Sequence, residues 1–172
     1  MKVILGTVQT TNGMIAKTDF SENFLSEESW KIWKSLAEKI GCFIVGRKTY
    51  ELVGRWEGEN FNNVRAKKII ISKNKNLKLN PDFILADSPK EALKIASKMG
   101  FRTVLVSGGS KTNSSFMKEK LVDELILIIE PYILGKGIRI FAEGKFENKL
   151  KLIKIKKFKN RIIQLEYKVI KN

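Results

Sequence analysis

Residues 42–51 read CFIVGRKTYE, and this stretch decides the fold class. Its apolar run, Cys42–Val45, has no polar interruption, which is typical of a strand buried on both faces of a parallel sheet. Gly46 ends the run, and a helix is predicted to begin directly after it with Arg47. A buried strand that passes straight into a helix is the repeating unit of an α/β protein.

The same alternation of strands and helices continues on both sides of this stretch. Ser26 is placed to cap a helix that Gly41 ends, and Ser88 caps another helix whose first residue is Pro89. Further strands are predicted at residues 2–8, 68–72, 102–107 and 124–130. The chain is therefore expected to form one α/β domain over residues 1–172, with a mostly parallel central sheet flanked by helices.

The C-terminal part of the chain follows a different pattern. Residues 150–152 and 163–169 alternate apolar and polar side chains, and Lys159-Asn160-Arg161 lies between the two halves. This alternation predicts an antiparallel hairpin that extends the sheet, with its apolar side chains on one face and lysines on the solvent face.

Composition excludes several kinds of site. The chain has no histidine and one cysteine, so a Ser-His-Asp or Cys-His site, a His-ligated metal and an intrachain disulfide cannot form. No metal site is expected, and Cys42 is interpreted as a buried core thiol. No apolar run is long enough to span a bilayer, and the N-terminus lacks the features of a signal peptide. We therefore expect a cytoplasmic protein that does not bind membranes.

The formal net charge is +15, from 33 Lys and Arg against 18 Asp and Glu. The excess is greatest over residues 145–171, where the lysines belong to the alternating strands. Neither a basic helix nor interleaved aromatic and basic residues are found there, so a solvated lysine face is favoured over nucleic-acid binding. A basic nucleic-acid module stays open as a minor alternative.

Two segments stand where ligands bind to such a sheet, beyond the carboxyl ends of its strands. Each follows a buried strand, contains glycine, and adds cations and hydroxyls at a helix start, where phosphate groups bind well. Glycine also lets a ligand approach the backbone closely. Together they indicate a phosphate-bearing cofactor; the residues are Gly46, Arg47, Lys48 and Thr49 in one segment, and Gly108, Gly109, Ser110 and Lys111 in the other.

These and other segments resemble a known superfamily. Residues 46–51 (GRKTYE) look like the Gly-Arg-x-Thr helix start of dihydrofolate reductases. Four further segments resemble the reductase domain of riboflavin biosynthesis: residues 11–16 (TNGMIA), 107–109 (SGG), 121–125 (LVDEL) and 131–137 (PYILGKG). The ordered set covers nearly the whole chain and is most similar to the stand-alone reductase branch, without a fused deaminase.

This resemblance implies a dihydrofolate-reductase-like fold with NADPH as the hydride donor. The cofactor carries the hydride chemistry, so no protein nucleophile is needed and the missing histidine is no obstacle. Related riboflavin reductases are usually dimers, which implies a homodimer. The resemblance assigns Arg47, Lys48 and Thr49 to the adenosine phosphates, Ser72 and Lys73 to the 2′-phosphate, Gly108, Gly109, Ser110 and Lys111 to the pyrophosphate, and Ile15 and Ala16 to the nicotinamide.

The substrate side departs from both branches of the superfamily. Asn12 and Met14 stand where riboflavin-pathway reductases have Asp and Lys, and Ser107 stands where they often have Glu. Dihydrofolate reductases hold the pterin with a carboxylate of the first helix; Trp30 falls near that position, with Glu28 close by. The substrate-side candidates are therefore Asn12, Glu28, Trp30 and Ser107, and the proton donor is not identified.

The expected function is NADPH-dependent reduction of a small heterocyclic substrate. The favoured substrate is the phosphorylated ribosylamino-pyrimidinone or ribosylamino-uracil of riboflavin biosynthesis, and dihydrofolate or a dihydropterin is the closest alternative. A non-catalytic nucleotide-binding protein with the same fold is the alternative from another class.

Overall fold

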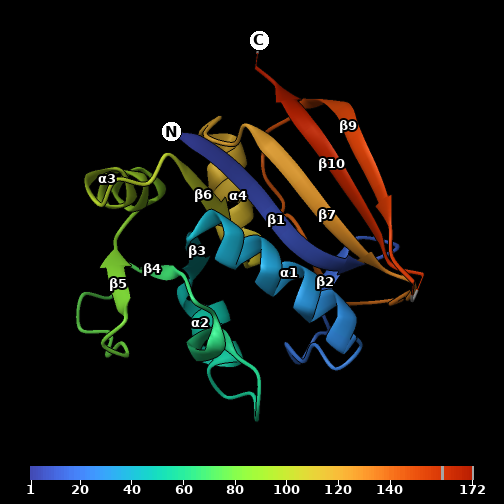
Figure 1. Ribbon diagram of the computed structural model, residues 1–172, viewed down its shortest axis with the longest axis horizontal. Coiled ribbons are helices and arrows are strands. Elements are labelled where there is room, and N and C mark those ends of the chain that lie inside the picture. Colours follow the sequence, from blue (N-terminus) through green and yellow to red (C-terminus); the bar gives the residue numbers. More distant parts are fainter. Residues whose placement is uncertain (160, 172) are drawn as a thin grey trace.

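The computed structural model describes residues 1–171 apart from Asn160, so that one residue of the predicted C-terminal turn lies outside the described residues. Its main feature is an eight-stranded sheet in the order β5-β4-β3-β6-β1-β7-β10-β9, with a small sheet of β2 and β8 beside it (Figure 1). The strands are β1 (Lys2–Thr10), β2 (Met14–Ala16), β3 (Cys42–Gly46), β4 (Lys67–Ile71), β5 (Phe83–Ala86), β6 (Thr103–Val106), β7 (Glu124–Glu130), β8 (Ile138–Arg139), β9 (Lys149–Lys157) and β10 (Ile163–Ile170). The helices are α1 (Glu27–Ile40), α2 (Arg47–Val53), α3 (Pro89–Lys98) and α4 (Ser110–Lys118), with a 3₁₀ turn at Phe61–Asn63.

The pairing of the strands confirms the predicted fold class. From β5 to β7 every neighbouring pair in the large sheet is parallel. β10 then runs antiparallel to β7, and β9 runs antiparallel to β10. The structure is therefore a mostly parallel α/β sheet that ends in an antiparallel hairpin, as the change of sequence pattern indicated.

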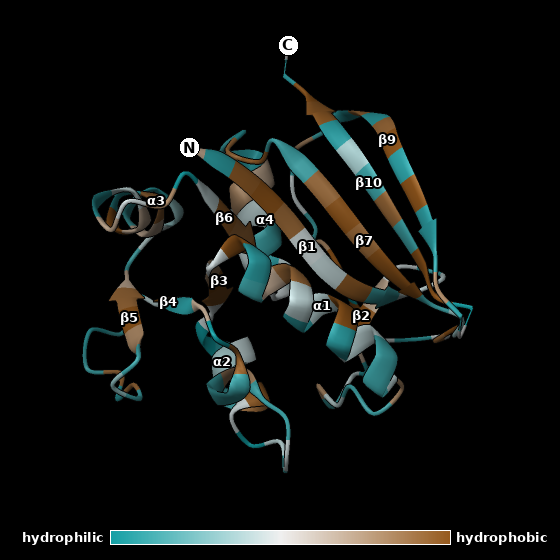
Figure 2. Ribbon diagram, viewed as in Figure 1, coloured by the Kyte–Doolittle hydropathy of each residue, from teal (hydrophilic) through white to brown (hydrophobic). Residues whose placement is uncertain are grey.

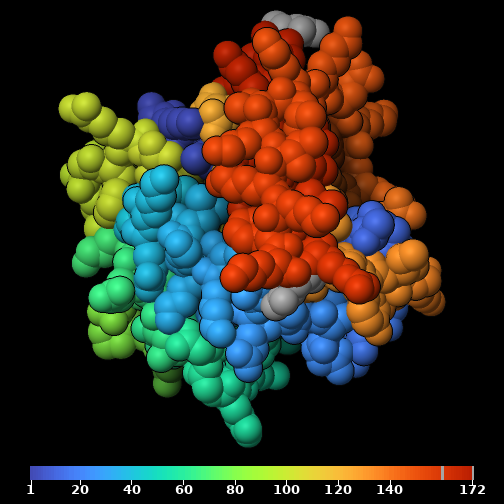
Figure 3. Space-filling model, turned by 45° about the vertical axis from the view of Figure 1, so that its right-hand side comes forward, coloured from blue at the N-terminus to red at the C-terminus, as the bar shows by residue number. Residues whose placement is uncertain are grey.

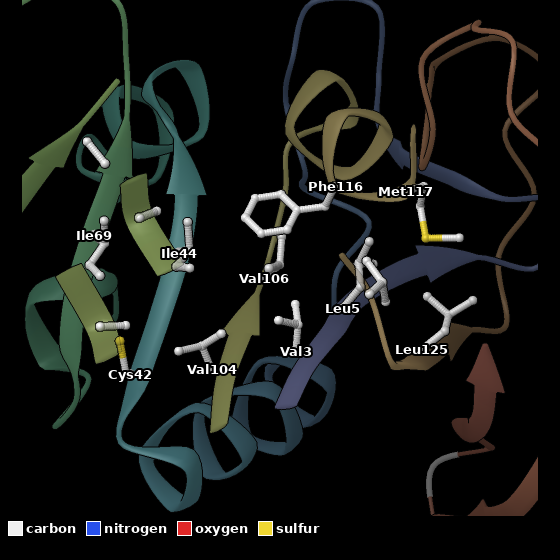
Figure 4. Close-up of a cluster of buried hydrophobic side chains, with 14 of the residues drawn as sticks. Val3, Leu5, Cys42, Ile44, Ile69, Val104, Val106, Phe116, Met117 and Leu125 are labelled. Atoms are coloured by element: carbon white, nitrogen blue, oxygen red, sulfur yellow. The ribbon is translucent and has the colours of Figure 1, made fainter. Parts of the chain in front are cut away.

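Helices cover both faces of the parallel strands, which explains their continuous apolar runs. Successive side chains of a strand point to opposite faces. Thus Val3 and Leu5 pack with Phe116 of α4 in one core cluster, whereas Ile4 packs with Trp33 of α1 in the other. Figure 4 shows the first cluster, with Cys42 buried among aliphatic side chains.

The predicted ends of α1 are confirmed. The Ser26 hydroxyl accepts a hydrogen bond from the Ser29 N–H at 3.2 Å, and Gly41 has the left-handed conformation, with φ of +82°, that suits glycine at a helix end. The carboxylate of Glu130, at the end of β7, accepts bonds from both the N–H and the hydroxyl of Ser26. The start of α1 is thereby tied to the carboxyl end of the sheet.

The C-terminal hairpin is more exposed than its pattern predicted. Across the pair, Tyr167 faces Leu152 and Leu165 faces Ile155, with an irregularity between Glu166 and Tyr167. β9 nevertheless leaves its apolar side chains in solvent as well as its lysines, and Ile155 is 59% exposed. Figure 2 shows hydrophobic and hydrophilic residues alternating along β9 and β10, and Figure 3 shows this C-terminal part of the chain at the surface of the molecule. The lysine face was predicted, but the uncovered apolar face was not.

Among residues 1–171 other than Asn160, no helix combines the length and the apolar character that crossing a membrane requires.

Candidate functional site

The two glycine-containing segments meet at the carboxyl edge of the sheet, because β3 and β6 are neighbouring parallel strands. The N–H of Gly46 donates to the carbonyl of Gly108 at 2.7 Å. A Cβ atom on Gly109 would lie 2.9 Å from the Thr49 hydroxyl, and a Cβ atom on Gly46 would overlap the hydroxyl of Thr112. The glycines therefore let the start of α2 and the start of α4 come together.

A small cleft of about 70 Å³ opens beside this junction. Its walls come from β1, β2, the loop before α1, both helices α1 and α2, the segment from Trp56 to Phe61, and the turn Ser107–Gly109.

Aromatic rings form one wall of the cleft. Trp30 stacks on Trp33 with ring centroids 5.0 Å apart and meets Trp56 edge-on at 5.5 Å, and Phe61 completes the cluster. The Trp30 indole N–H donates to Glu59 at 3.3 Å, which helps to fix the ring. Trp30 therefore lines the cleft, and Trp33, interpreted as a core residue, is both buried and part of the wall. Such a wall suits the face of a flat heterocycle.

Ser107 also lies at the cleft, but its hydroxyl is engaged. It donates to the carbonyl of Gly6 at 2.8 Å and accepts a hydrogen bond from the Trp33 indole. The side chain thus joins β6 to β1 and α1, and its proton is not available to a substrate while that bond is made.

The other two substrate-side candidates do not line the cleft in the described part of the chain. Asn12 donates to the carbonyl of Leu134 at 2.6 Å and accepts from the Thr10 hydroxyl at 2.8 Å, so it holds the β1–β2 turn against the segment after β7. Glu28 lies in the first turn of α1, outside the residues that form the walls. Both candidates are thus placed beside the cleft and not at its surface.

Glu22 is a cleft residue that the sequence did not reveal. It lies in the loop between β2 and α1, where the Leu25 N–H donates to its carbonyl at 2.9 Å and closes a turn. Phe24 is buried and stacks on Tyr132 at 5.7 Å, which holds the loop in place. Burial raises the pKa of the Glu22 carboxyl to about 8. A single acid in a polar loop carries no periodicity or motif by which it could have been recognised.

The residues assigned to the phosphates surround the α2–α4 junction. The first N–H groups of any helix have no partner within the helix. At the start of α4, after Gly109, no side chain caps these groups and the first turn has no acidic residue. Arg47 forms an ion pair with Glu51 at 2.9 Å, which offsets part of its charge. The Lys48 ammonium lies 5.0 Å from the centre of the Phe20 ring.

The remaining assigned residues lie at the two ends of this region. Ile15 lines the cleft, whereas Ala16 is buried next to it. Ser72, directly after β4, accepts a hydrogen bond from the Asn74 N–H, and Lys73 is exposed. Asp87 lies nearby: a hydrogen bond from Ser88 does most to lower the pKa of its carboxyl, and the charges of Lys75 and Lys73 lower it further.

Comparison with known proteins agrees with the resemblance found in the sequence. The model of the RibD C-terminal domain matches residues 1–164. The protein YwjB of Bacillus subtilis is 28% identical over 170 residues, which are 96% of this chain and 97% of that protein. YyaP of the same species is 24% identical over 176 residues, covering 96% and 94%. The riboflavin biosynthesis protein RibD of Aquifex aeolicus is 35% identical over 69 residues, covering 39% of this chain and 19% of that protein.

Solved structures share the fold. A putative riboflavin biosynthesis protein from a Shewanella species superposes with a TM-score of 0.81 at 18% identity, covering 99% of this chain and all of the other. A pyrimidine reductase-like protein from Corynebacterium diphtheriae gives 0.79 at 14% identity, covering 99% and 92%. A bifunctional diaminohydroxyphosphoribosylaminopyrimidine deaminase and phosphoribosylaminouracil reductase from Thermotoga maritima gives 0.74 at 20% identity, and this chain corresponds to 56% of it.

Proposed function

The chain belongs to the RibD C-terminal domain family, and from that premise we propose that it is an oxidoreductase that uses NADPH to reduce a phosphorylated ribosylamino-pyrimidine. The observation that carries the proposal is the position of the glycine junction beside the aromatic cleft, at the carboxyl edge of a parallel sheet. Ligands of such sheets bind at that edge. The reductase named for the Thermotoga maritima relative acts on a substrate of this class.

The residues present fit a dinucleotide with phosphate groups. In the proposal the first N–H groups of α4 and the turn Gly108–Gly109 hold the pyrophosphate, with Ser110 and Lys111 beside it. Support comes from the close approach of Gly109 to Thr49, since a side chain at position 109 would fill the space. When bound, NADPH supplies the hydride.

At the two ends of the dinucleotide the proposal uses the residues assigned from the resemblance. Arg47, Lys48 and Thr49 lie at the adenosine phosphates, with Ser72 and Lys73 at the 2′-phosphate. Ile15, which lines the cleft, lies along the nicotinamide, and Ala16 supports it from the buried side. NADPH held by these residues would supply its hydride at the cleft, where the aromatic wall would orient the heterocycle.

The pyrimidine substrate is preferred to a pterin for a structural reason. A protonated pterin needs a carboxylate partner. Among the described residues neither acid in the first turn of α1 lines the cleft, and burial keeps the carboxyl of Glu22, which does line it, mostly protonated near neutral pH. The flat ring of either compound fits the wall of Trp30 and Trp56, so the choice depends on the polar groups of the cleft. Those groups are hydroxyls and the single carboxyl of Glu22.

We also propose that residues 1–172 act as one reductase domain and that two copies associate. Support for one domain is the large sheet, whose strands run from Lys2 to Ile170. Support for a homodimer is the apolar face of the hairpin, where Leu150, Leu152 and Ile155 are all more than 40% exposed. Large uncovered apolar surfaces mark association sites, and a two-fold pair is the commonest arrangement.

A screen of NADPH oxidation tests the proposed activity. Ribosylamino-pyrimidine phosphates, dihydrofolate and dihydropterins are offered in parallel, and loss of the NADPH absorbance is followed. Turnover with the pyrimidine phosphates is expected. Turnover with dihydrofolate alone would replace the substrate by the pterin class. NADPH binding without turnover of any substrate would favour the non-catalytic nucleotide-binding protein.

A further inference from the structure

A reduction of this class needs a proton as well as a hydride, and few groups in the cleft can supply one. The side chains that line it include the hydroxyls of Thr7, Thr49 and Ser107, which are too weakly acidic to give up a proton near neutral pH. The hydroxyls of Thr7 and Ser107 also donate to backbone carbonyls. Among the described lining residues, Glu22 is the one with an ionisable side chain.

The surroundings of Glu22 suit a carboxyl that keeps its proton. The walls contributed by β1, β2, α1, α2 and the turn at residues 107–109 place aliphatic, aromatic and hydroxyl groups around the cleft, with no other charged side chain among the described lining residues. No hydrogen bond reaches its carboxyl oxygens from the described residues. Desolvation is the cause that raises the pKa of Glu22 to about 8, so near neutral pH the group is mostly the neutral acid.

We propose that Glu22 is the catalytic acid of this cleft and protonates the substrate nitrogen as the hydride is delivered. This role rests on the function proposed above. The ring-opened ribosylamino group presents a C=N bond: the hydride forms a new C–H bond at the carbon, and the π-electron pair moves to the nitrogen. That nitrogen takes the proton of the Glu22 O–H. The C=N bond is reduced, the nicotinamide is oxidised, and the Glu22 carboxylate left behind regains a proton from water.

The loop geometry supports this role. The turn closed between Leu25 and Glu22, and the stacking of Phe24 on Tyr132, hold the residue at the wall of the cleft. Glu22 itself is half-buried, so water can reach the carboxyl between turnovers.

The experiment compares Glu22→Gln with Glu27→Gln. Glu27 is a matched control, because its side chain is 92% exposed in the first turn of α1 and the change is the same replacement of a carboxyl by an amide. Hydride transfer is measured in single-turnover reactions as a function of pH, and NADPH affinity is measured separately. Glu22→Gln should bind NADPH as the wild type does but transfer hydride at least about a hundredfold more slowly, the usual contribution of a general acid. The wild-type rate should fall above about pH 8, and that dependence should disappear in Glu22→Gln.

Two further measurements keep the proposal falsifiable. Glu22→Asp retains the acid and should recover part of the lost rate, which a purely structural role does not predict. Carbon-13 NMR should show the Glu22 carboxyl titrating near pH 8 in the free protein. A wild-type rate and pH profile in Glu22→Gln, or a carboxyl that titrates as in a free peptide, would overturn the role alone. A wild type that reduces none of the substrates would overturn the proposed function and this role with it.

Discussion

The Thr49 hydroxyl lies close to Gly109, 2.9 Å from the position that a Cβ atom there would occupy. The two residues are sixty positions apart in the chain. Thr49 belongs to the helix that follows β3, and Gly109 precedes the helix that follows β6. Because β3 and β6 are neighbours in the sheet, both helices start at one edge. The proposed phosphate site therefore depends on the order of the strands in the sheet and on the absence of a side chain at position 109.

Gly109→Ala tests that contact. The added methyl must push the Thr49 hydroxyl away or separate the two helix starts, since 2.9 Å is too short for a Cβ contact. Gly109 has φ of −73°, a value that alanine also adopts. We expect NADPH to bind about tenfold more weakly, about 1.4 kcal/mol, with the fold retained. Calorimetric titration measures this. Gly144→Ala is the control, because the new methyl there meets only the Phe146 ring and a distant carbonyl. Unchanged affinity in Gly109→Ala would place the phosphate site elsewhere.

Cofactor preference is expected to depend on Lys73. Arg47 is already paired with Glu51, whereas Lys73 is exposed at the end of β4, where the 2′-phosphate is proposed to bind. NADPH should bind roughly ten- to a hundredfold more tightly than NADH, because a charge-assisted hydrogen bond contributes about 1.5–3 kcal/mol. Lys73→Ala should weaken NADPH alone, and Lys145→Ala should weaken neither. Equal affinities for the two cofactors in the wild-type protein would contradict this preference.

The parts of the fold that the sequence predicts well are those governed by local rules. Ser26 and Gly41 bound α1 because a hydroxyl cap and a left-handed glycine are needed at those places whatever lies around them. The strand from Cys42 is identifiable because two helical layers require an uninterrupted apolar run. A parallel sheet also places residues 46–49 and 108–112 at the same edge, but their meeting requires β3 and β6 to be neighbours, and that strand order comes from the structure.

Side-chain roles at the site depend on partners far away in the chain, which a pattern cannot supply. Asn12 is engaged by Leu134, and the hydroxyl of Ser107 is engaged by Gly6 and Trp33. Both were candidates for touching the substrate because they stand where the resembled reductases have their substrate-side residues. Glu22 was missed for the opposite reason, since what distinguishes it is the desolvation that the folded cleft imposes.

Association through the hairpin is tested by Ile155→Lys. Ile155 is 59% exposed and shares its face with Leu152, Leu165 and Tyr167, so a lysine there would place a charge in the proposed interface. The wild type should sediment as a dimer, and this variant as a monomer of 19.7 kDa. Met99→Lys makes the same replacement at the end of α3, where Met99 is 38% exposed, and should remain dimeric. A wild type that is monomeric at micromolar concentration would exclude the dimer.

Cys42 is expected to be inert in the folded protein. It is fully buried in β3, and burial raises the pKa of its thiol to about 12, so the reactive thiolate is scarce at any ordinary pH. A thiol-specific chromogenic reagent should therefore react only as fast as the chain unfolds, and denaturant should accelerate the reaction in parallel with unfolding measured by circular dichroism. Rapid labelling of the native protein would contradict both the burial and the interpretation as a core thiol.

The pH dependence of stability offers a test of Glu22 that does not depend on any activity. Its carboxyl has a pKa of about 8 in the folded state against 4.5 for the unperturbed group. Between these values the folded chain holds a proton that the unfolded chain has released, so the contribution of Glu22 to stability is complete below pH 4.5 and is lost as the pH rises to about 8.

Glu22→Gln cannot titrate and should lose this dependence. Relative to the wild type its melting temperature should rise steadily from about pH 5 to pH 8, and the difference should be largest at the upper end. Thermal denaturation at a series of pH values measures this difference directly. Glu27→Gln, which alters an exposed side chain, should follow the wild-type curve throughout. A melting-temperature difference between Glu22→Gln and the wild type that stays constant with pH would mean that the Glu22 carboxyl is ionised in the folded cleft over this range. An ionised carboxyl has no proton to donate to the substrate, so this result would contradict the proposed role.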